Sequence, residues 1–133
     1  MEIATGYFAK AKTYAGMGYA LVSIARVAPW FLAKELNVYS CECLAPTDDI
    51  LALKNSPSKY SARYKDEILK HRVPAKVLHW LRMVAHQEHT DKVVLMCYES
   101  PEKFCHRHLV AEWLTNELPD NGIVSEVVAP KKR

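Results

Sequence analysis

The stretch that decides the fold is Val93-Val94-Leu95-Met96-Cys97, which is apolar at every position. A strand with one face in water alternates apolar and polar residues, whereas a parallel strand covered on both faces is a continuous apolar run. The stretch is therefore predicted to be an interior strand of a mainly parallel sheet. Because ligands collect outside the carboxyl ends of such strands, the residues after position 97 are the first candidates for a functional site.

Four other segments are expected to add strands to this sheet. Residues 19–25 are apolar and partly β-branched, residues 38–44 alternate, and residues 123–128 follow an Asp-Asn-Gly turn signal. Residues 3–8 indicate one more short strand near the N-terminus.

Helical patterns fill the intervals between these strands. Thr47, which precedes two aspartates, is typical of a helix N-cap, and its helix is expected to run to about Lys54. A second helical stripe begins at Ser58, and Pro74 is well placed as the first residue of a third helix. A last helix is predicted to end near Leu118. Strands separated by helices indicate an α/β fold: a single three-layer domain with a mostly parallel sheet flanked by helices.

The composition fits one folded domain over residues 1–133. Hydrophobic residues make up 50% of the 133 and charged residues 25%, which excludes a disordered or low-complexity chain. No apolar run reaches the roughly 18 residues that cross a bilayer, and the N-terminus lacks the layout of a signal peptide. We therefore expect a cytoplasmic protein without a membrane partner. The net charge of +3 equals the short basic tail at residues 131–133, so it supports nucleic-acid binding only weakly.

The cysteines fit that compartment. They lack the density and spacing of a secreted disulfide framework, and they are Cys41, Cys43, Cys97 and Cys105. The Cys-x-Cys and His-x-His gaps in the chain do not match the ligand spacing of structural zinc, so no metal site is predicted. No Walker loop or Gly-x-Gly-x-x-Gly sequence occurs, and the sequence names no cofactor.

The densest set of reactive side chains follows the first strand, within residues 97–108. The candidates for catalysis there are Cys97, Glu99, Cys105 and His106, and Arg107 is a candidate for ligand binding. A thiolate, an imidazole and a guanidinium together suit attack on an anionic substrate, or the binding of one. Cysteine is also among the most buried residue types, so a packing role for either sulfur stays open.

A helix start is expected inside the same segment. Ser100 and Pro101 are typical of an N-cap followed by a first-turn proline. Free backbone N–H groups at such a start are electropositive and lower the pKa of a nearby thiol. Arg107 is expected to be an ion-pair or anion ligand shielded from solvent, with Glu99 as the nearest candidate carboxylate in the sequence.

Two specific chemistries fail on spacing. A cysteine-phosphatase loop needs arginine six positions after its nucleophile, and Lys103 stands there. A zinc deaminase needs cysteines in a Pro-Cys-x-x-Cys sequence, whereas Cys97 and Cys105 are eight residues apart and neither follows proline.

Two other places supply candidates for ligand binding. Ser23 and Arg26 lie at the carboxyl end of an early strand, where a guanidinium can bind a phosphate or carboxylate bidentately or can pair with an acidic neighbour. Tyr60 and Tyr64 lie one helical turn apart and can stack on a base or ring. An aromatic stripe at helical spacing is more often core packing.

These residues carry a resemblance to a known family. Residues 94–99 form an apolar strand ending in Cys-Tyr-Glu, and residues 104–114 carry Cys-His-Arg at the start of a helix. In this the chain resembles the domain of unknown function 488 family, and residues 23–26, 44–46 and 60–64 agree with it as well. The resemblance implies a small α/β domain typical of bacteria and their phages. It implies one site but no reaction, substrate or cofactor.

The leading functional hypothesis is an enzyme that acts on an anionic small molecule, such as a nucleotide, or on a base in nucleic acid. Arg26 and Arg107 would hold the anion, Glu99 or His106 would be the general acid or base, and one cysteine of the cluster would be the nucleophile.

Two alternatives stand beside it. The same cleft could belong to a non-catalytic module that binds a nucleotide-like ligand or a partner protein. The cluster could also be structural, with function on an exposed face near Trp30 and Phe31, although burial under a helix is the more common fate of such a pair. The sequence leaves the oligomeric state open.

Overall fold

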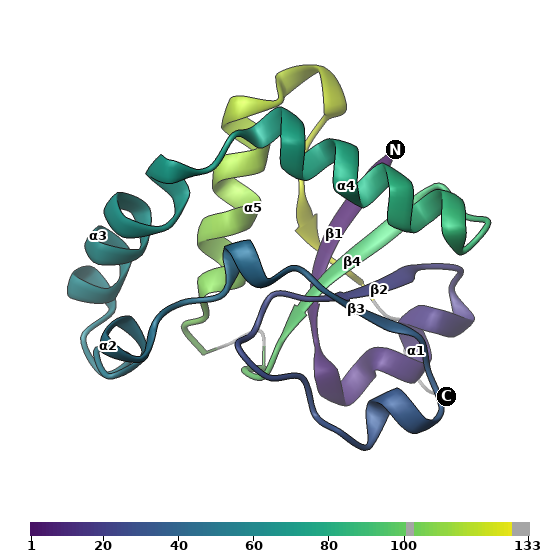
Figure 1. Ribbon diagram of the computed structural model, residues 1–133, viewed down its shortest axis with the longest axis horizontal. Helices are drawn as coiled ribbons and strands as arrows, with labels where there is room; N and C mark the ends of the chain where they lie inside the picture. The colour runs from purple at the N-terminus through teal and green to yellow at the C-terminus, as the bar shows by residue number, and fades with distance from the viewer. Residues whose placement is uncertain (101–102, 129–133) are drawn as a thin grey trace.

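A computed structural model describes residues 1–100 and 103–128 (Figure 1). It contains one parallel sheet with the strand order β3-β2-β4-β1-β5. The strands are β1 (Glu2–Tyr7), β2 (Ala20–Ser23), β3 (Val38–Ser40), β4 (Lys92–Cys97) and β5 (Ser125–Glu126). The predicted α/β class with a parallel sheet is confirmed, and β4 is the interior strand that its apolar run predicts.

Helices and short 3₁₀ turns connect the strands. The helices are α1 (Ala11–Gly16), α2 (Asp48–Leu51), α3 (Pro57–Glu67), α4 (Pro74–Gln87) and α5 (His106–Glu117). The 3₁₀ turns are η1 (Phe8–Lys10), η2 (Leu32–Lys34), η3 (Glu42–Leu44), η4 (Leu69–His71) and η5 (Pro119–Asn121). None of the helices in the described part of the chain has the length and apolar character that crossing a bilayer requires.

The two faces of β4 bury different cores, since side chains alternate across a strand. Val93, Leu95 and Cys97 point into the larger core, which α3, α4 and α5 complete. Val94 and Met96 point into a smaller core against η1 and α1. All five are buried, which explains why the strand carries no polar position between Val93 and Cys97.

Strand β1 has the six residues that the sequence indicates, but it begins one residue earlier, at Glu2. It pairs with β4 along six residues, and its positions 3–6 are buried. At Gly6 a Cβ atom would lie 2.5 Å from the Tyr14 ring of α1, so the close approach of that ring requires glycine. Phe8, which the sequence placed in the strand, instead opens η1, and α1 was not predicted.

Several predicted boundaries are wrong, each for a local reason. The strand predicted for residues 38–44 ends at Ser40, because η3 turns the chain and buries Leu44. The strand predicted for residues 123–128 pairs only at Ser125–Glu126, and the backbone N–H of Val124 is taken by the Thr115 hydroxyl. Other signals are confirmed: the Thr47 hydroxyl caps α2 by accepting from the Ile50 N–H, and Pro74 opens α4.

The helix expected to start at Ser100 begins later. Its N-cap is Cys105 and its first residue is His106, so Ser100 lies in the connecting loop. Pro101 and the basic tail at 131–133 lie outside the described residues. Trp30 and Phe31 are 71% and 57% exposed, so this pair is not buried under a helix.

Candidate functional site

The candidate site is a crevice at the carboxyl ends of β2 and β4, the sheet edge that the sequence singles out. These strands are neighbours, but β2 leads to β3 at one edge of the sheet while β4 leads towards β5 at the other edge. Loops that leave in opposite directions open a crevice between them, which is where ligands bind in open α/β sheets. The crevice has a volume of about 500 Å³.

Most of the sequence-predicted site residues line this crevice. They are Arg26, Tyr60, Cys97, Glu99, Cys105 and His106. The other three do not line it, because Ser23, Tyr64 and Arg107 are fully buried beneath it. Residues that the sequence did not single out complete the wall, and among them Asp48, Lys54, Tyr98 and Phe104 are polar or aromatic.

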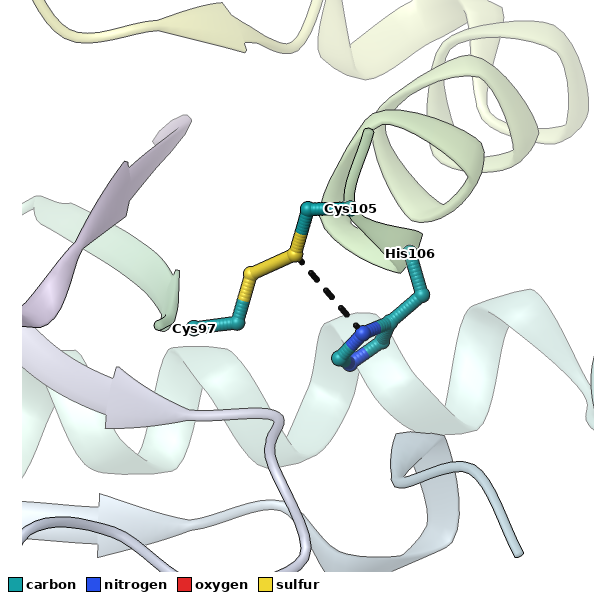
Figure 2. A group of neighbouring side chains, drawn as sticks. All are labelled: Cys97, Cys105 and His106. Carbon is teal, nitrogen blue, oxygen red and sulfur yellow. Dashed lines mark hydrogen bonds between the residues drawn. A yellow bond between two sulfur atoms is a disulfide. The ribbon is translucent and has the colours of Figure 1, made fainter. Parts of the chain in front are cut away.

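Cys97 and Cys105 meet at the floor of the crevice and are joined by a disulfide (Figure 2). Both are nearly buried. Cys97 comes from the last position of β4 and Cys105 from the N-cap of α5, so the bond ties the central strand to the helix that follows it. In this form neither sulfur is a free thiol. A nucleophilic role for either cysteine therefore requires reduction first.

His106 lies beside this disulfide with a defined tautomer. Its Nε2 is 2.7 Å from the carbonyl oxygen of Ile24, and because a carbonyl only accepts, Nε2 carries the proton. Nδ1 then has a free lone pair, and it points at the Cys105 sulfur 3.8 Å away (Figure 2). Burial lowers the pKa of His106 to about 4, so the ring is neutral at pH 7. A neutral imidazole aimed at a sulfur can accept its proton.

Arg107 is buried beneath the floor of the site and bonds groups from β4, β5 and the loop after β4. Its guanidinium makes a bidentate ion pair with Glu126 of β5, at 3.0 Å and 2.9 Å. The remaining nitrogen donates to the backbone carbonyl of Glu99 at 2.5 Å and to the sulfur of Cys97 at 3.1 Å. The shielded ion pair expected for Arg107 is present, but the expectation that Glu99 supplies the carboxylate is wrong. Glu99 contributes its carbonyl oxygen, because β5 brings Glu126 closer.

The environment of Glu126 fits this pairing. Burial by itself raises the pKa of the Glu126 carboxyl, but hydrogen bonds from Arg107 and from the Thr5 hydroxyl, at 2.6 Å, hold it below its ordinary value. The carboxylate is therefore charged at neutral pH and matches the buried guanidinium.

Arg26 and Lys54 bring positive charge to the rim of the crevice. Arg26 forms an ion pair with Asp48, and both side chains reach solvent. Ion pairs between exposed groups contribute little to stability, so a ligand anion can replace Asp48 as the partner of this guanidinium. Ser23 has a different position: its hydroxyl accepts from the Ala25 N–H at 3.3 Å and shapes the turn that presents Arg26.

Aromatic side chains form another part of the wall. Tyr60 and Phe104 pack edge to face with ring centroids 5.0 Å apart, and burial raises the pKa of Tyr60. Tyr64, one turn further along α3, turns away from the crevice and donates its hydroxyl to the Leu44 carbonyl. The two tyrosines therefore differ in role: Tyr60 lines the crevice and Tyr64 anchors η3.

The floor of the crevice could hold a metal ion only in its reduced form. Ligand atoms of Cys97, Cys105 and His106 lie within 4.8 Å of one another, and this is the group of three metal-ligating side chains found in the described part of the chain. Two thiolates and an imidazole suit zinc or another soft divalent ion. The sequence spacing predicted no metal site, because Cys97 and Cys105 are eight residues apart and only the fold brings them together.

The fold and crevice define a small α/β protein with a candidate site at the carboxyl edge of a parallel sheet. The chain matches the family model described as "DUF488-N3a: Active DUF488-N3 subclade" over residues 12–118, which is most of its length. It belongs to this family. Comparisons with curated proteins and with solved structures gave no match.

Proposed function

We propose that this protein is an enzyme that acts on an anionic, nucleotide-like small molecule bound in the crevice between β2 and β4. The observation that carries the proposal is the convergence of charge, rings and reactive groups on one cavity: Arg26, Tyr60, Cys105 and His106 all line it. A volume of about 500 Å³ falls in the range of roughly 300–1,000 Å³ typical of small-molecule sites. The description of the matched family calls its subclade active and names no reaction.

The rim of the crevice supplies the recognition of an anion. Arg26 and Lys54 both line the cavity, and the exposed partner of Arg26 is Asp48. A guanidinium presents parallel donors that match two phosphate oxygens, while a lysine ammonium adds a point charge. A phosphate dianion can displace Asp48 and take its place as the partner of Arg26.

The wall of the crevice supplies a surface for a ring. Tyr60 and Phe104 present aromatic carbon there, and Tyr98 lies 55% exposed at the mouth. The remaining apolar lining comes from Ala25, Val27, Pro46 and Leu51. A base or sugar face can pack on such a wall at little desolvation cost, whereas its phosphate stays at the rim.

The floor of the crevice supplies the chemistry after a thiol reductant has opened the disulfide. Cys105 is then the nucleophile, because its sulfur lies 3.8 Å from Nδ1 of His106, which has the free lone pair. Cys105 is the N-cap of α5, so its sulfur lies at the N-terminal end of the helix, where the helix dipole favours a thiolate. His106 takes the proton of the Cys105 thiol on Nδ1, and the sulfur forms a bond to the electrophilic centre of the substrate. The bond to the leaving group then breaks, and the leaving group departs with that proton. Cys97 supplies the second thiol of the reduced pair, and the carboxyl of Glu99 is a second candidate acid at the wall.

Calorimetric titration of the reduced protein with nucleoside 5′-monophosphates tests the binding. We expect saturable binding that Arg26→Ala weakens at least tenfold. Arg82→Ala is the matched control, since Arg82 is exposed on α4 and does not line the crevice, and we expect it to bind like the wild type. Equal affinities in the two variants, or no binding to any of the nucleotides, would contradict the proposal.

Alkylation separates the enzyme from a non-catalytic module. After reduction, Cys105 should react with iodoacetamide well below the pH expected for an ordinary thiol of pKa about 8.5, and bound nucleotide should protect it. If both Cys97 and Cys105 stay unreactive until denaturant is added while nucleotide still binds, the protein is a binding module instead.

A further inference from the structure

A second pair of cysteines lies at the end of β3, outside the lining of the crevice. The sulfurs of Cys41 and Cys43 are 3.7 Å apart, and both are free thiols. Cys41 is 5% exposed and belongs to the larger core, whereas Cys43 is exposed. Both line a separate hollow of about 470 Å³ between η3 and the start of α4. The sulfur of Cys43 is therefore accessible, and the sulfur of Cys41 lies buried next to it.

Positive charge gathers around the exposed sulfur. Arg72 donates from Nε to the backbone carbonyl of Cys43 at 2.6 Å, which fixes its guanidinium beside this residue. The charged and titratable groups that line the hollow with the pair are Glu42, His71, Arg72 and Lys76, and the neutral phenol of Tyr64 in α3 interacts with both sulfurs from the buried side. Three of the four groups in the hollow are basic or can become cationic, so the surroundings favour a thiolate over a neutral thiol.

The contact between the two sulfurs shifts their pKa values in opposite directions. The hydrogen bond from Cys41 lowers the pKa of Cys43 to about 6, and the Arg72 guanidinium acts in the same direction. The same contact, together with burial, raises the pKa of Cys41. Cys43 is therefore the anionic sulfur at neutral pH, and Cys41 is the protonated thiol that donates to it.

We propose that Cys41 and Cys43 form a peroxide-reactive dithiol, in which Cys43 is the attacking thiolate and Cys41 the resolving thiol. The geometry supports this pairing because an accessible, anionic sulfur beside a second thiol is the arrangement found in cysteines that sense oxidants. The contact of 3.7 Å must shorten to a bond of about 2.05 Å, a movement that two side chains separated by one residue can make together.

The chemistry balances with a hydroperoxide as the oxidant. The Cys43 thiolate attacks one peroxide oxygen, the O–O bond breaks, and the departing hydroxide takes up a proton to leave as water. The product is a Cys43 sulfenic acid. The sulfur of Cys41 then attacks the sulfur of Cys43, the S–O bond breaks, and the leaving hydroxide takes the Cys41 proton. In total, two thiols and one hydrogen peroxide give one disulfide and two waters.

Peptide mapping of the native protein after treatment with hydrogen peroxide tests the proposal directly. Trypsin leaves both sulfurs in one peptide, residues 35–54, which should lose two hydrogen atoms without gaining a partner. The other pair is distinguishable, because cleavage after Lys103 separates Cys97 from Cys105, so their disulfide joins two peptides. The double variant Cys97→Ser/Cys105→Ser is the control and should oxidise at residues 35–54 as the wild type does. Absence of that oxidised peptide in the wild type would overturn the proposal.

Single variants assign the two roles. In Cys41→Ser, or in Cys41→Ala if serine unfolds the core, the Cys43 sulfenic acid should persist long enough for dimedone to trap it. In Cys43→Ser no oxidation of residues 35–54 should follow at the same peroxide dose.

The pH profile gives a further check. At pH 6, iodoacetamide should modify Cys43 about tenfold faster than a small-molecule thiol of ordinary pKa, since the larger thiolate fraction outweighs its lower nucleophilicity. Arg72→Gln should move the midpoint of the profile upward, and Arg72→Lys should move it less. A midpoint near 8.5 in the wild type, or trapping of a sulfenic acid at Cys41 in place of Cys43, would overturn the assignment.

Discussion

Replacing Arg107 by alanine should destabilise this protein more than any exposed ion-pair substitution. Arg107 is fully buried and bonds Glu126, the Glu99 carbonyl and the Cys97 sulfur. Breaking a buried ion pair by removing one partner costs about 3–5 kcal/mol, because the other charge stays in a poorly solvated place. The Glu126 side chain is 24% exposed, so water can reach the carboxylate once its partner is removed. We therefore expect a loss at the lower end of that range, about 3 kcal/mol.

Urea unfolding at pH 7 measures this loss, and its pH dependence tests the cause. The pKa of Glu126 in the folded protein is below its ordinary value of 4.5, so its stabilising contribution is present above pH 4.5 and is lost as the pH falls through the folded value. The difference between wild type and Arg107→Ala should accordingly shrink below pH 4.5. Glu126→Gln provides a second variant if Arg107→Ala does not fold. A difference under about 1 kcal/mol at pH 7, or one that does not change in acid, would refute the role of this pair.

Two further predictions concern the histidine of the site and the packing of β1. Folded His106 has a pKa of about 4 against 6.5 for the unperturbed residue. Its contribution to stability is therefore fully present above pH 6.5, and the free energy of unfolding should fall by about 1 kcal/mol per pH unit between pH 6 and 5. In His106→Gln this slope should be smaller, and an unchanged slope would count against a neutral, buried ring. Gly6→Ala places a Cβ atom 2.5 Å from the Tyr14 ring and should cost about 1–3 kcal/mol in urea unfolding. Gly16→Ala, where nothing lies within 4 Å, is its control and should be neutral or stabilising; equal effects would mean that the ring moves freely.

The parts of the fold that the sequence could predict are those with local causes. The run from Val93 to Cys97 is apolar because both faces of β4 are covered, and Pro74 opens a helix through its own fixed backbone angle. Helix α1 escaped prediction because only Ala11 and Tyr14 of its six residues are buried, which leaves no long apolar stripe. The predicted length of β5 was too great because the Val124 N–H bonds the Thr115 hydroxyl and not a neighbouring strand. The two residues that do pair bring Glu126 to Arg107.

The candidate site was predictable as far as it depends on strand ends. Arg26 follows β2 and Glu99 follows β4, and neighbouring parallel strands bring their carboxyl ends together. The partner of Arg107 was not predictable, because Glu126 reaches it only through the pairing of β5 with β1. Nor does spacing reveal that Ser23 points inward, since which face of a strand meets the core depends on the helices packed against it.

A map of where a nucleotide binds tests the proposed crevice site most directly. Adenosine 5′-monophosphate is titrated into the reduced, ¹⁵N-labelled protein, and the backbone amide shifts are followed residue by residue. We predict that the largest changes fall in the two loops of the crevice, residues 25–27 and 104–106, and saturate together with the change at Arg26. Shifts confined to other surfaces, such as the exposed side of α4, or the absence of any saturating shift, would contradict it.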